Sequence, residues 1–218
     1  MANNSGAAEK DAHLAHHFVD SEQQFEASKL GMWVFLVTEI LFFGGLFVAY
    51  IVFRSWHPDL FEQAAMTLDT TLGAVNTVVL IASSLTIVLA VRAAQINDQR
   101  QQLIMLGATI AFAITFMVIK YFEYTHKFEY GMLPAGLYTY DGIEHELAPV
   151  FYSIYYMMTG LHGIHVIIGI GLIGWLMVRA AKGTFHSNYF TPIEIVALYW
   201  HLVDIIWIFL FPLLYLIE

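Results

Sequence analysis

Five long apolar blocks, separated by shorter polar segments, dominate the hydrophobic pattern of this chain. Each block reaches the ~20 apolar residues that a helix needs to cross a bilayer. The pattern therefore predicts an all-α, five-helix transmembrane bundle, in which residues 29–218 form a single domain. The predicted spans cover residues 30–53, 71–95, 103–126, 149–178 and 192–217.

Residues 1–28 are polar and carry three histidines, His13, His16 and His17. We expect them to form a mobile, solvated tail rather than a metal site. Basic residues orient the bundle, because loops on the cytoplasmic side of a membrane are enriched in Lys and Arg. With a cytoplasmic N-terminus, the outer segments hold only Arg54 and Lys127, and the other basic residues between spans lie inside. This asymmetry predicts a periplasmic C-terminus.

Composition supports the membrane assignment and excludes several functional classes. The chain is 59% hydrophobic and 12% charged, whereas about a quarter of the residues in a soluble domain are charged. The net charge of −9 and the lack of a basic patch argue against a nucleic-acid partner. With no cysteine, the chain has no structural disulfide, thiolate metal site or cysteine nucleophile.

Ionisable residues within the predicted spans are the first candidates for function, because a charge inside a bilayer is expensive. Spacing on a helix places several of them in pairs, since residues three and four apart share a face. They are Glu39 in the first span, Lys120 and Glu123 in the third, His162 and His165 in the fourth, and His201 and Asp204 in the fifth.

We expect Glu39 to pair with His165 or His162, because all three lie near mid-membrane. Lys120 and Glu123 predict an ion pair near the outer interface. For His201 and Asp204, a proton-relay pair and a structural helix–helix hydrogen bond are equally open. Histidines are common metal ligands, but no further ligands complete a site, so hydrogen-bonded interior histidines are the preferred interpretation.

The fourth span has two distinct faces. Gly160, Gly163, Gly171 and Gly174 follow one narrow stripe at three- and four-residue steps. Small residues on a membrane helix allow another backbone to approach closely. We therefore expect the glycine stripe to pack tightly, and His162, His165 and Gly169 to lie on the opposite face.

Four stretches of the chain, taken together and in order, carry a family resemblance. The chain resembles subunit III of the haem–copper oxidases, most closely the cytochrome c oxidase branch, and the resemblance covers nearly everything from 30 to 217. The two helices that begin the seven-helix form of the family are missing, as in five-helix bacterial forms. The matching stretches are Thr38–Phe43, Val75–Ser83, Thr159–Gly169 and Tyr199–Trp207.

The resemblance implies an accessory subunit of a proton-pumping terminal oxidase in a bacterial cytoplasmic membrane. Such a subunit has no catalytic residue and binds no haem or copper, which belong to partner subunits. It packs on subunit I in a complex with subunit II, holds phospholipids, and supports proton uptake and stability of the catalytic subunit; a larger respiratory supercomplex is a further possible partner. Glu39 matches the carbodiimide-reactive family carboxylate, and Arg179 and Lys182 match basic positions near lipid headgroups.

Three alternatives stay open at this point. The chain is a membrane electron carrier if His201 and either His162 or His165 bind one b-type haem on facing helices. It is a proton or ion conduit if the mid-membrane acid and histidines conduct. It also resembles subunit III of quinol oxidases and the accessory protein of nitric oxide reductase.

Overall fold

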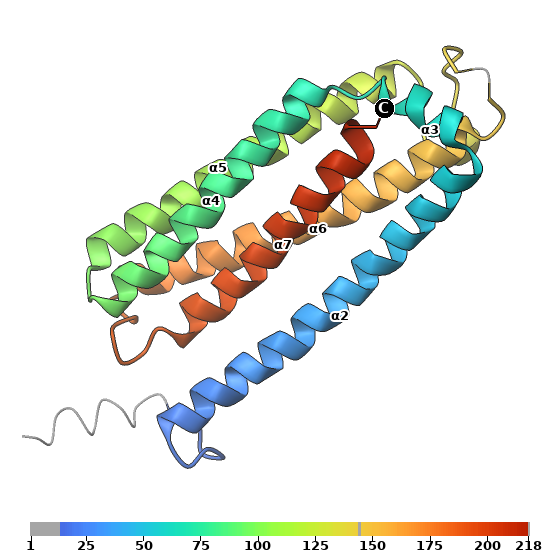
Figure 1. Ribbon diagram of the computed structural model, residues 1–218. Helices are drawn as coiled ribbons and strands as arrows, with labels where there is room; N and C mark the ends of the chain where they lie inside the picture. The colour runs from blue at the N-terminus through green and yellow to red at the C-terminus, as the bar shows by residue number, and fades with distance from the viewer. Residues whose placement is uncertain (1–13, 144, 218) are drawn as a thin grey trace, which may run out of the picture.

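A computed structural model describes residues 14–143 and 145–217 and shows five long helices lying side by side (Figure 1). Each is long and apolar enough to cross a bilayer, and no strand occurs in the described ranges. The predicted all-α, five-helix membrane bundle is therefore confirmed. The long helices are α2 (Ser21–Trp56), α4 (Thr70–Gln95), α5 (Gln99–Glu129), α6 (Ala148–Ala181) and α7 (Thr191–Tyr215).

The start of the first helix differs most from the predicted spans. Helix α2 begins at Ser21, before the expected boundary of the tail, because the Asp20 side chain accepts a hydrogen bond from the Gln23 amide at 2.7 Å and caps the helix. His16 and His17 are exposed just ahead of it, while His13 lies outside the described residues.

The segment after α2 forms a short helix, α3 (Pro58–Ala65), where the sequence predicted a loop. Pro58 occupies its first turn, where a missing amide hydrogen costs nothing. Leu60, Phe61 and Ala64 are buried beneath it. A single 3₁₀ turn, η1 (Ala135–Leu137), lies in the connection between α5 and α6.

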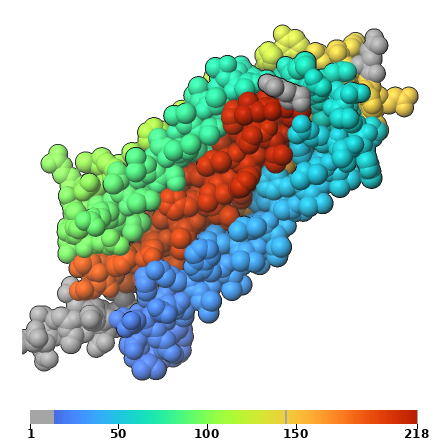
Figure 2. Space-filling view, viewed as in Figure 1, coloured from blue at the N-terminus to red at the C-terminus, as the bar shows by residue number. Residues whose placement is uncertain are grey.

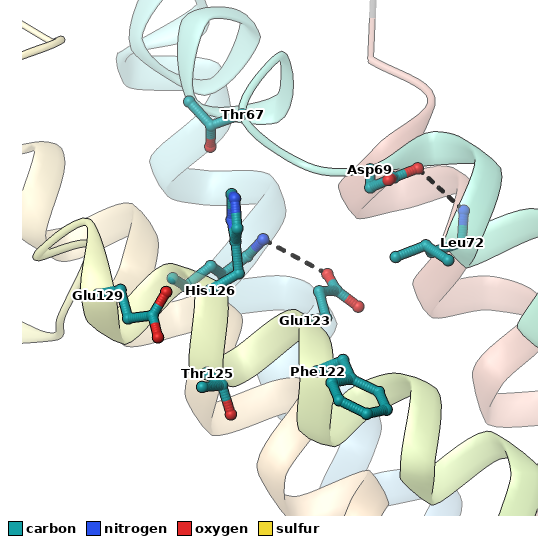
Figure 3. A pocket seen from close by; sticks show the side chains of 9 residues that line it. Thr67, Asp69, Leu72, Phe122, Glu123, Thr125, His126 and Glu129 are labelled. Carbon is teal, nitrogen blue, oxygen red and sulfur yellow. Dashed lines mark hydrogen bonds and ion pairs between the residues drawn. The ribbon is translucent and has the colours of Figure 1, made fainter.

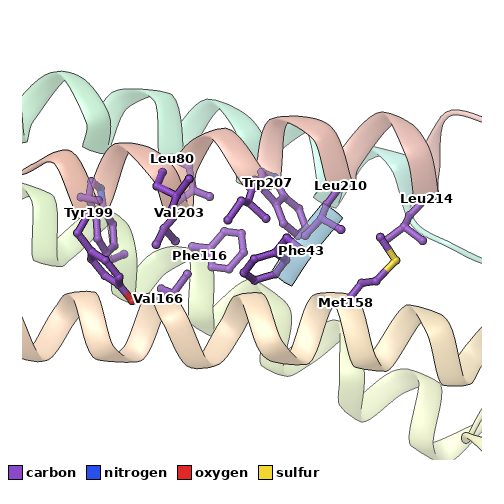
Figure 4. Close-up of a cluster of buried hydrophobic side chains, with 14 of the residues drawn as sticks. Phe43, Leu80, Phe116, Met158, Val166, Tyr199, Val203, Trp207, Leu210 and Leu214 are labelled. Carbon is purple, nitrogen blue, oxygen red and sulfur yellow. The ribbon is translucent and has the colours of Figure 1, made fainter. Parts of the chain in front are cut away.

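Helix α7 is the centre of the bundle, and α2 is its least buried member. In the most apolar stretch of each helix, 56% of residues are buried in α7 but only 17% in α2. Figure 2 shows α7 lying between α4 and α2 on one face of the molecule. The core around it is aromatic: the rings of Trp207, Phe116 and Phe43 lie between α7 and α6 (Figure 4) and contact the imidazoles of α6.

Helix α2 meets the bundle along one seam. Its buried residues are Met32, Leu36, Phe43 and Tyr50, which follow steps of four, seven and seven residues. A seven-residue repeat keeps one stripe of a helix facing its partner. Glu39 falls within the same stripe, three residues after Leu36, so the seam aims its carboxyl at the bundle.

The glycine stripe of α6 makes no close contact within the described part of this chain. A Cβ added at Gly160, Gly163, Gly171 or Gly174 would have no atom within 4 Å, so these residues face outward. Close packing occurs instead at Gly169, where an added Cβ would lie 2.5 Å from the Trp200 ring. The sequence separated the two faces of α6, and within this chain the bundle packs on the face that carries His162, His165 and Gly169.

Candidate functional site

Glu39 lies against His165 where α2 meets α6. The Nε2 atom of His165 is 3.1 Å from Oε2 of Glu39, and the two side chains are 15% and 18% exposed. Of the two partners considered from the sequence, the structure brings Glu39 to His165. The Tyr199 hydroxyl donates to the carbonyl oxygen of His165 at 2.9 Å, which ties α7 to the same point.

The hydrogen bonds of His165 define what the pair does chemically. Its Nδ1 atom lies 2.8 Å from the Leu161 carbonyl oxygen, which only accepts, so Nδ1 carries a hydrogen. The contact between Nε2 and Glu39 therefore holds one further proton, on either the imidazole or the carboxyl. Both arrangements have zero net charge, which lowers the cost of placing these groups inside a membrane.

His162, one turn from His165, lies in the interior. Its ring is fully buried between Phe116, at 5.5 Å between ring centroids, and Trp207, at 5.4 Å. Neither ring nitrogen makes a hydrogen bond within the described part of the chain. His162 therefore contributes aromatic contacts and does not bind Glu39.

Glu123 is the centre of a buried polar network near the C-terminal end of α5. Its carboxylate accepts from Lys120 at 2.9 Å, from the Tyr215 hydroxyl at 2.6 Å and from the Tyr155 hydroxyl at 2.8 Å. Lys127 lies 3.5 Å away, one turn further along α5. The expected Lys120–Glu123 pair forms, but it is more deeply buried and has more partners than helix spacing alone indicated.

Aromatic rings surround the Lys120 ammonium. It lies 4.6 Å from the Trp207 ring centroid, 5.1 Å from that of Tyr215 and 5.6 Å from that of Tyr155. Cation–π attraction at these distances partly replaces the lost hydration of the ammonium group. This environment joins three helices that are far apart along the chain, so no pattern within one helix predicts it.

A pocket of about 460 Å³ lies beside this network, between the end of α5 and the turn that leads into α4 (Figure 3). Glu123 and Lys127 line it from α5, and Asp69 lines it from the opposite side, where its carboxylate caps α4 by accepting from the Leu72 amide. His126 extends into the same space in Figure 3. The pocket combines both signs of charge at one end of the bundle.

His201 and Asp204 do not bind each other. Nδ1 of His201 lies 2.7 Å from the Ser84 hydroxyl of α4, which is the helix–helix hydrogen bond considered from the sequence. Asp204 is 2% exposed, and neither of its carboxyl oxygens makes a hydrogen bond among the described residues. The two residues lie in the same seam between α4 and α7 but have different surroundings.

Arg179 and Lys182 lie at the other end of the bundle from Glu123. The Arg179 guanidinium lies over the Trp175 ring at 5.0 Å and near the Phe185 ring at 5.4 Å. Lys182 is exposed just after α6 ends. A groove of about 370 Å³, lined by Trp175 and by residues at the start of α2 and α7, opens next to them.

Metal binding finds no support in the residues that the structure describes. No group of three or more His, Asp or Glu side chains there is arranged to hold a metal ion. His165 has both ring nitrogens engaged by protein oxygens. The contacts seen are hydrogen bonds for His165 and His201 and ring contacts for His162.

Comparison with known proteins places these features in a family. The model of the family "Cytochrome c oxidase subunit III" matches residues 10–218. Cytochrome c oxidase subunit 3 of Thermostichus vulcanus is 35% identical over 190 residues, which are 87% of each chain. A probable quinol oxidase subunit 3 of Staphylococcus saprophyticus subsp. saprophyticus is 26% identical over 94% of this chain and 96% of its own.

A third relative joins two subunits in one polypeptide. The haem–copper oxidase subunit I+III of Aeropyrum pernix is 30% identical over 192 residues, which are 85% of this chain and 22% of that protein. Matches of this extent show the family. The chain belongs to the cytochrome c oxidase subunit III family and is the subunit III of a haem–copper oxidase, a multi-pass membrane protein that associates with subunit I.

Proposed function

We propose that this chain is an accessory subunit of a proton-pumping cytochrome c oxidase in a bacterial cytoplasmic membrane. It has no catalytic centre of its own, and haem and copper belong to subunits I and II. Its role is to support proton uptake and the durability of subunit I. The observation that carries this proposal is the Glu39–His165 pair, an ionisable and partly exposed site at a helix junction inside the membrane.

The cytochrome c branch is favoured over the quinol branch by sequence similarity. Identity is 35% to a cytochrome c oxidase subunit 3 and 26% to a quinol oxidase subunit 3, each over most of the chain. The electron donor tests the assignment. Membranes that contain the tagged subunit should oxidise reduced cytochrome c through the co-purified complex, and oxidation of a quinol alone would reassign it.

Phospholipid binding is proposed at the end of the bundle that holds Arg179 and Lys182. Their cationic groups lie beside a groove of about 370 Å³, lined in part by Trp175. Cations beside a membrane surface attract anionic lipid phosphates, and a Trp at that depth suits the interface. The same end is cytoplasmic in the orientation that the basic residues favour, with the C-terminus periplasmic.

The proton-uptake and stability role rests on the single proton shared by Glu39 and His165. Removing either group leaves the other in a membrane interior without its hydrogen-bond partner. We expect Glu39→Gln and His165→Ala each to leave the haem spectra of the complex intact. Each should also shorten the period over which the complex turns over before it inactivates.

A double-mutant cycle tests this directly in the purified oxidase. Because the two groups act as one unit, the double variant should inactivate no faster than the worse single variant. Thr38→Val is the matched control, since Thr38 is an exposed neighbour on α2 whose hydroxyl bonds only the Phe35 carbonyl. Additive effects, or an inactivation rate equal to that of the control, would remove the functional role from the pair.

The b-haem alternative is tested by a reduced-minus-oxidised spectrum of the isolated chain. His165 is already bound to Glu39 and to the Leu161 carbonyl, and Nδ1 of His201 is bound to Ser84. We therefore expect haem bands to leave with the larger subunits. One haem retained per isolated chain would overturn the accessory role, and proton flux through liposomes that hold only this chain would favour a conduit.

A further inference from the structure

Asp204 is a buried acid that takes no part in the contacts of Glu39 or Glu123. Asp204 lies where α7 packs against α4. Two tryptophans of α7 hold this contact by donating hydrogen bonds to α4, Trp200 to Ser83 at 3.0 Å and Trp207 to Thr77 at 3.1 Å. Neither carboxyl oxygen makes a hydrogen bond among the described residues. A bare carboxylate in this position is costly, and a bound proton removes that cost.

Ser84 and His201 form a short chain that leads away from Asp204. The Ser84 hydroxyl lies 2.7 Å from Nδ1 of His201, and Asp204 follows His201 by three residues, on the same face of α7. A hydroxyl group donates one hydrogen bond and accepts others. Ser84 is therefore the hydroxyl group through which a proton would pass from the imidazole toward the carboxyl.

A groove of about 150 Å³ continues the chain from His201 to the end of the bundle. Val88 and Ala197 line it from α4 and α7, and Glu194 lines it at the first turn of α7. Glu194 forms an ion pair with Lys29 at 2.8 Å, and the side chains are 22% and 37% exposed. At about 150 Å³ the groove is large enough for a few water molecules, and Glu194 and His201 are the polar residues of its lining that would bind them.

The other ionisable groups near Asp204 are held elsewhere. Lys120 of α5 and His162 of α6 both contact Trp207, one helical turn from Asp204, and Lys120 is bound to Glu123. The ionisable residue of α4 is Arg92, two turns beyond Ser84. Ser84 and His201 thus remain as the hydrogen-bonded polar pair beside Asp204, and His201 also lines the groove toward Glu194.

We propose that Asp204 is a proton-binding site that exchanges its proton with water at the Glu194 end of the bundle through Ser84 and His201. To load the site, a protonated water in the groove protonates Nε2 of His201. The imidazolium then gives its Nδ1 proton to Ser84 while the Ser84 hydroxyl proton passes to Asp204. In this transfer one N–H and one O–H bond break and two O–H bonds form, with no change of oxidation state.

This site does not depend on the role proposed for Glu39. It requires only the seam between α4 and α7, so its failure and the failure of the accessory function are separate results. Proton exchange, rather than turnover or durability, is the property to measure.

The test is infrared hydrogen–deuterium exchange on the purified oxidase with the full chain. We expect a protonated-carboxyl band that is absent in the isosteric variant Asp204→Asn and that shifts when the complex is moved into D₂O. Ser84→Ala removes the relay but keeps the acid, so it should slow the shift by roughly 100-fold, the range of a lost proton-transfer group. Haem content confirms assembly of each variant.

Val88→Phe tests the groove without removing any polar group. Val88 is 45% exposed, so a larger side chain covers the groove without overpacking the core. Val75→Phe is the matched control, because Val75 lies on the same helix, is equally exposed at 45%, and does not line the groove. The proposal is overturned if no band disappears with Asp204, or if Ser84→Ala and Val88→Phe exchange as fast as the control.

Discussion

Replacing Glu123 by glutamine tests the attraction between its buried carboxylate and the two ammonium groups beside it, those of Lys120 and Lys127. Glutamine keeps the size of the side chain but removes the charge that faces two buried ammonium groups. At the observed distances of 2.9 Å to Lys120 and 3.5 Å to Lys127, the gross attractions are roughly 6 and 5 kcal/mol at an effective dielectric constant of 20. Much of this gross energy offsets the cost of burying the charges.

The expected net loss is about 3–5 kcal/mol of unfolding free energy, because removing one partner leaves uncompensated buried charge. That is a large share of the roughly 5–15 kcal/mol that stabilises a typical protein. The assay is a denaturant titration of the purified oxidase, with unfolding of the tagged chain followed by its sensitivity to protease. Glu129→Gln is the control, since Glu129 is an exposed acid on the same helix and lines the same pocket.

A second variant separates charge from packing. Lys120→Met keeps the apolar stem that lies over Trp207, so combining it with Glu123→Gln removes one of the two unpaired cations. We expect the double variant to be more stable than Glu123→Gln alone. If Glu123→Gln were as stable as Glu129→Gln, or if adding Lys120→Met lowered stability further, the electrostatic reasoning would be refuted.

Three smaller predictions concern two buried contacts and one tyrosine between α5 and α6, and each is measured by the same denaturant titration. Gly169→Ala should cost about 1–3 kcal/mol, because its Cβ would lie 2.5 Å from the Trp200 ring; Gly171→Ala, which meets nothing within 4 Å, should gain up to about 1 kcal/mol from helix propensity. Trp200→Phe should lower the unfolding free energy by about 1–3 kcal/mol, because it removes the hydrogen bond to Ser83 and leaves space where a fully buried ring lay. Burial raises the pKa of Tyr138. The stability that the protonated phenol contributes is therefore present below the unfolded pKa of about 10 and is lost as pH rises through the higher folded pKa. Tyr138→Phe should make the unfolding free energy less dependent on pH in this range.

Apolar block length was sufficient to predict the five spans, because the bilayer sets the length of a membrane helix. It was not sufficient for α3, since eight residues give no signal of that kind. Helical spacing brought Lys120 and Glu123 together, but it said nothing of Tyr215, which is 92 residues from Glu123 in sequence. Contacts of this kind depend on how the helices are rotated against one another, and a pattern within one helix does not fix that rotation.

The assignment of the faces of α6 shows the same limit. Both faces lack formal charge, so hydrophobicity alone does not show which face packs against the other helices of this chain and which is turned outward. In the structure, the bulky Trp200 of α7 requires the space above Gly169, and this decides which face turns inward.

The way α2 packs against the rest of the bundle explains why Glu39 has a hydrogen-bond partner. Outside the seam α2 is mostly exposed, so its attachment depends on a few residues at seven-residue spacing and on polar contacts along the same stripe. Three such contacts divide the helix: Lys29 binds Glu194, Glu39 binds His165, and the Tyr50 hydroxyl donates to the Leu213 carbonyl. Apolar contacts between membrane helices discriminate weakly among registers, because lipid is as apolar as the side chains. Directional hydrogen bonds at three levels therefore set the register of α2, and the middle one joins Glu39 to His165 within the apolar part of the helix.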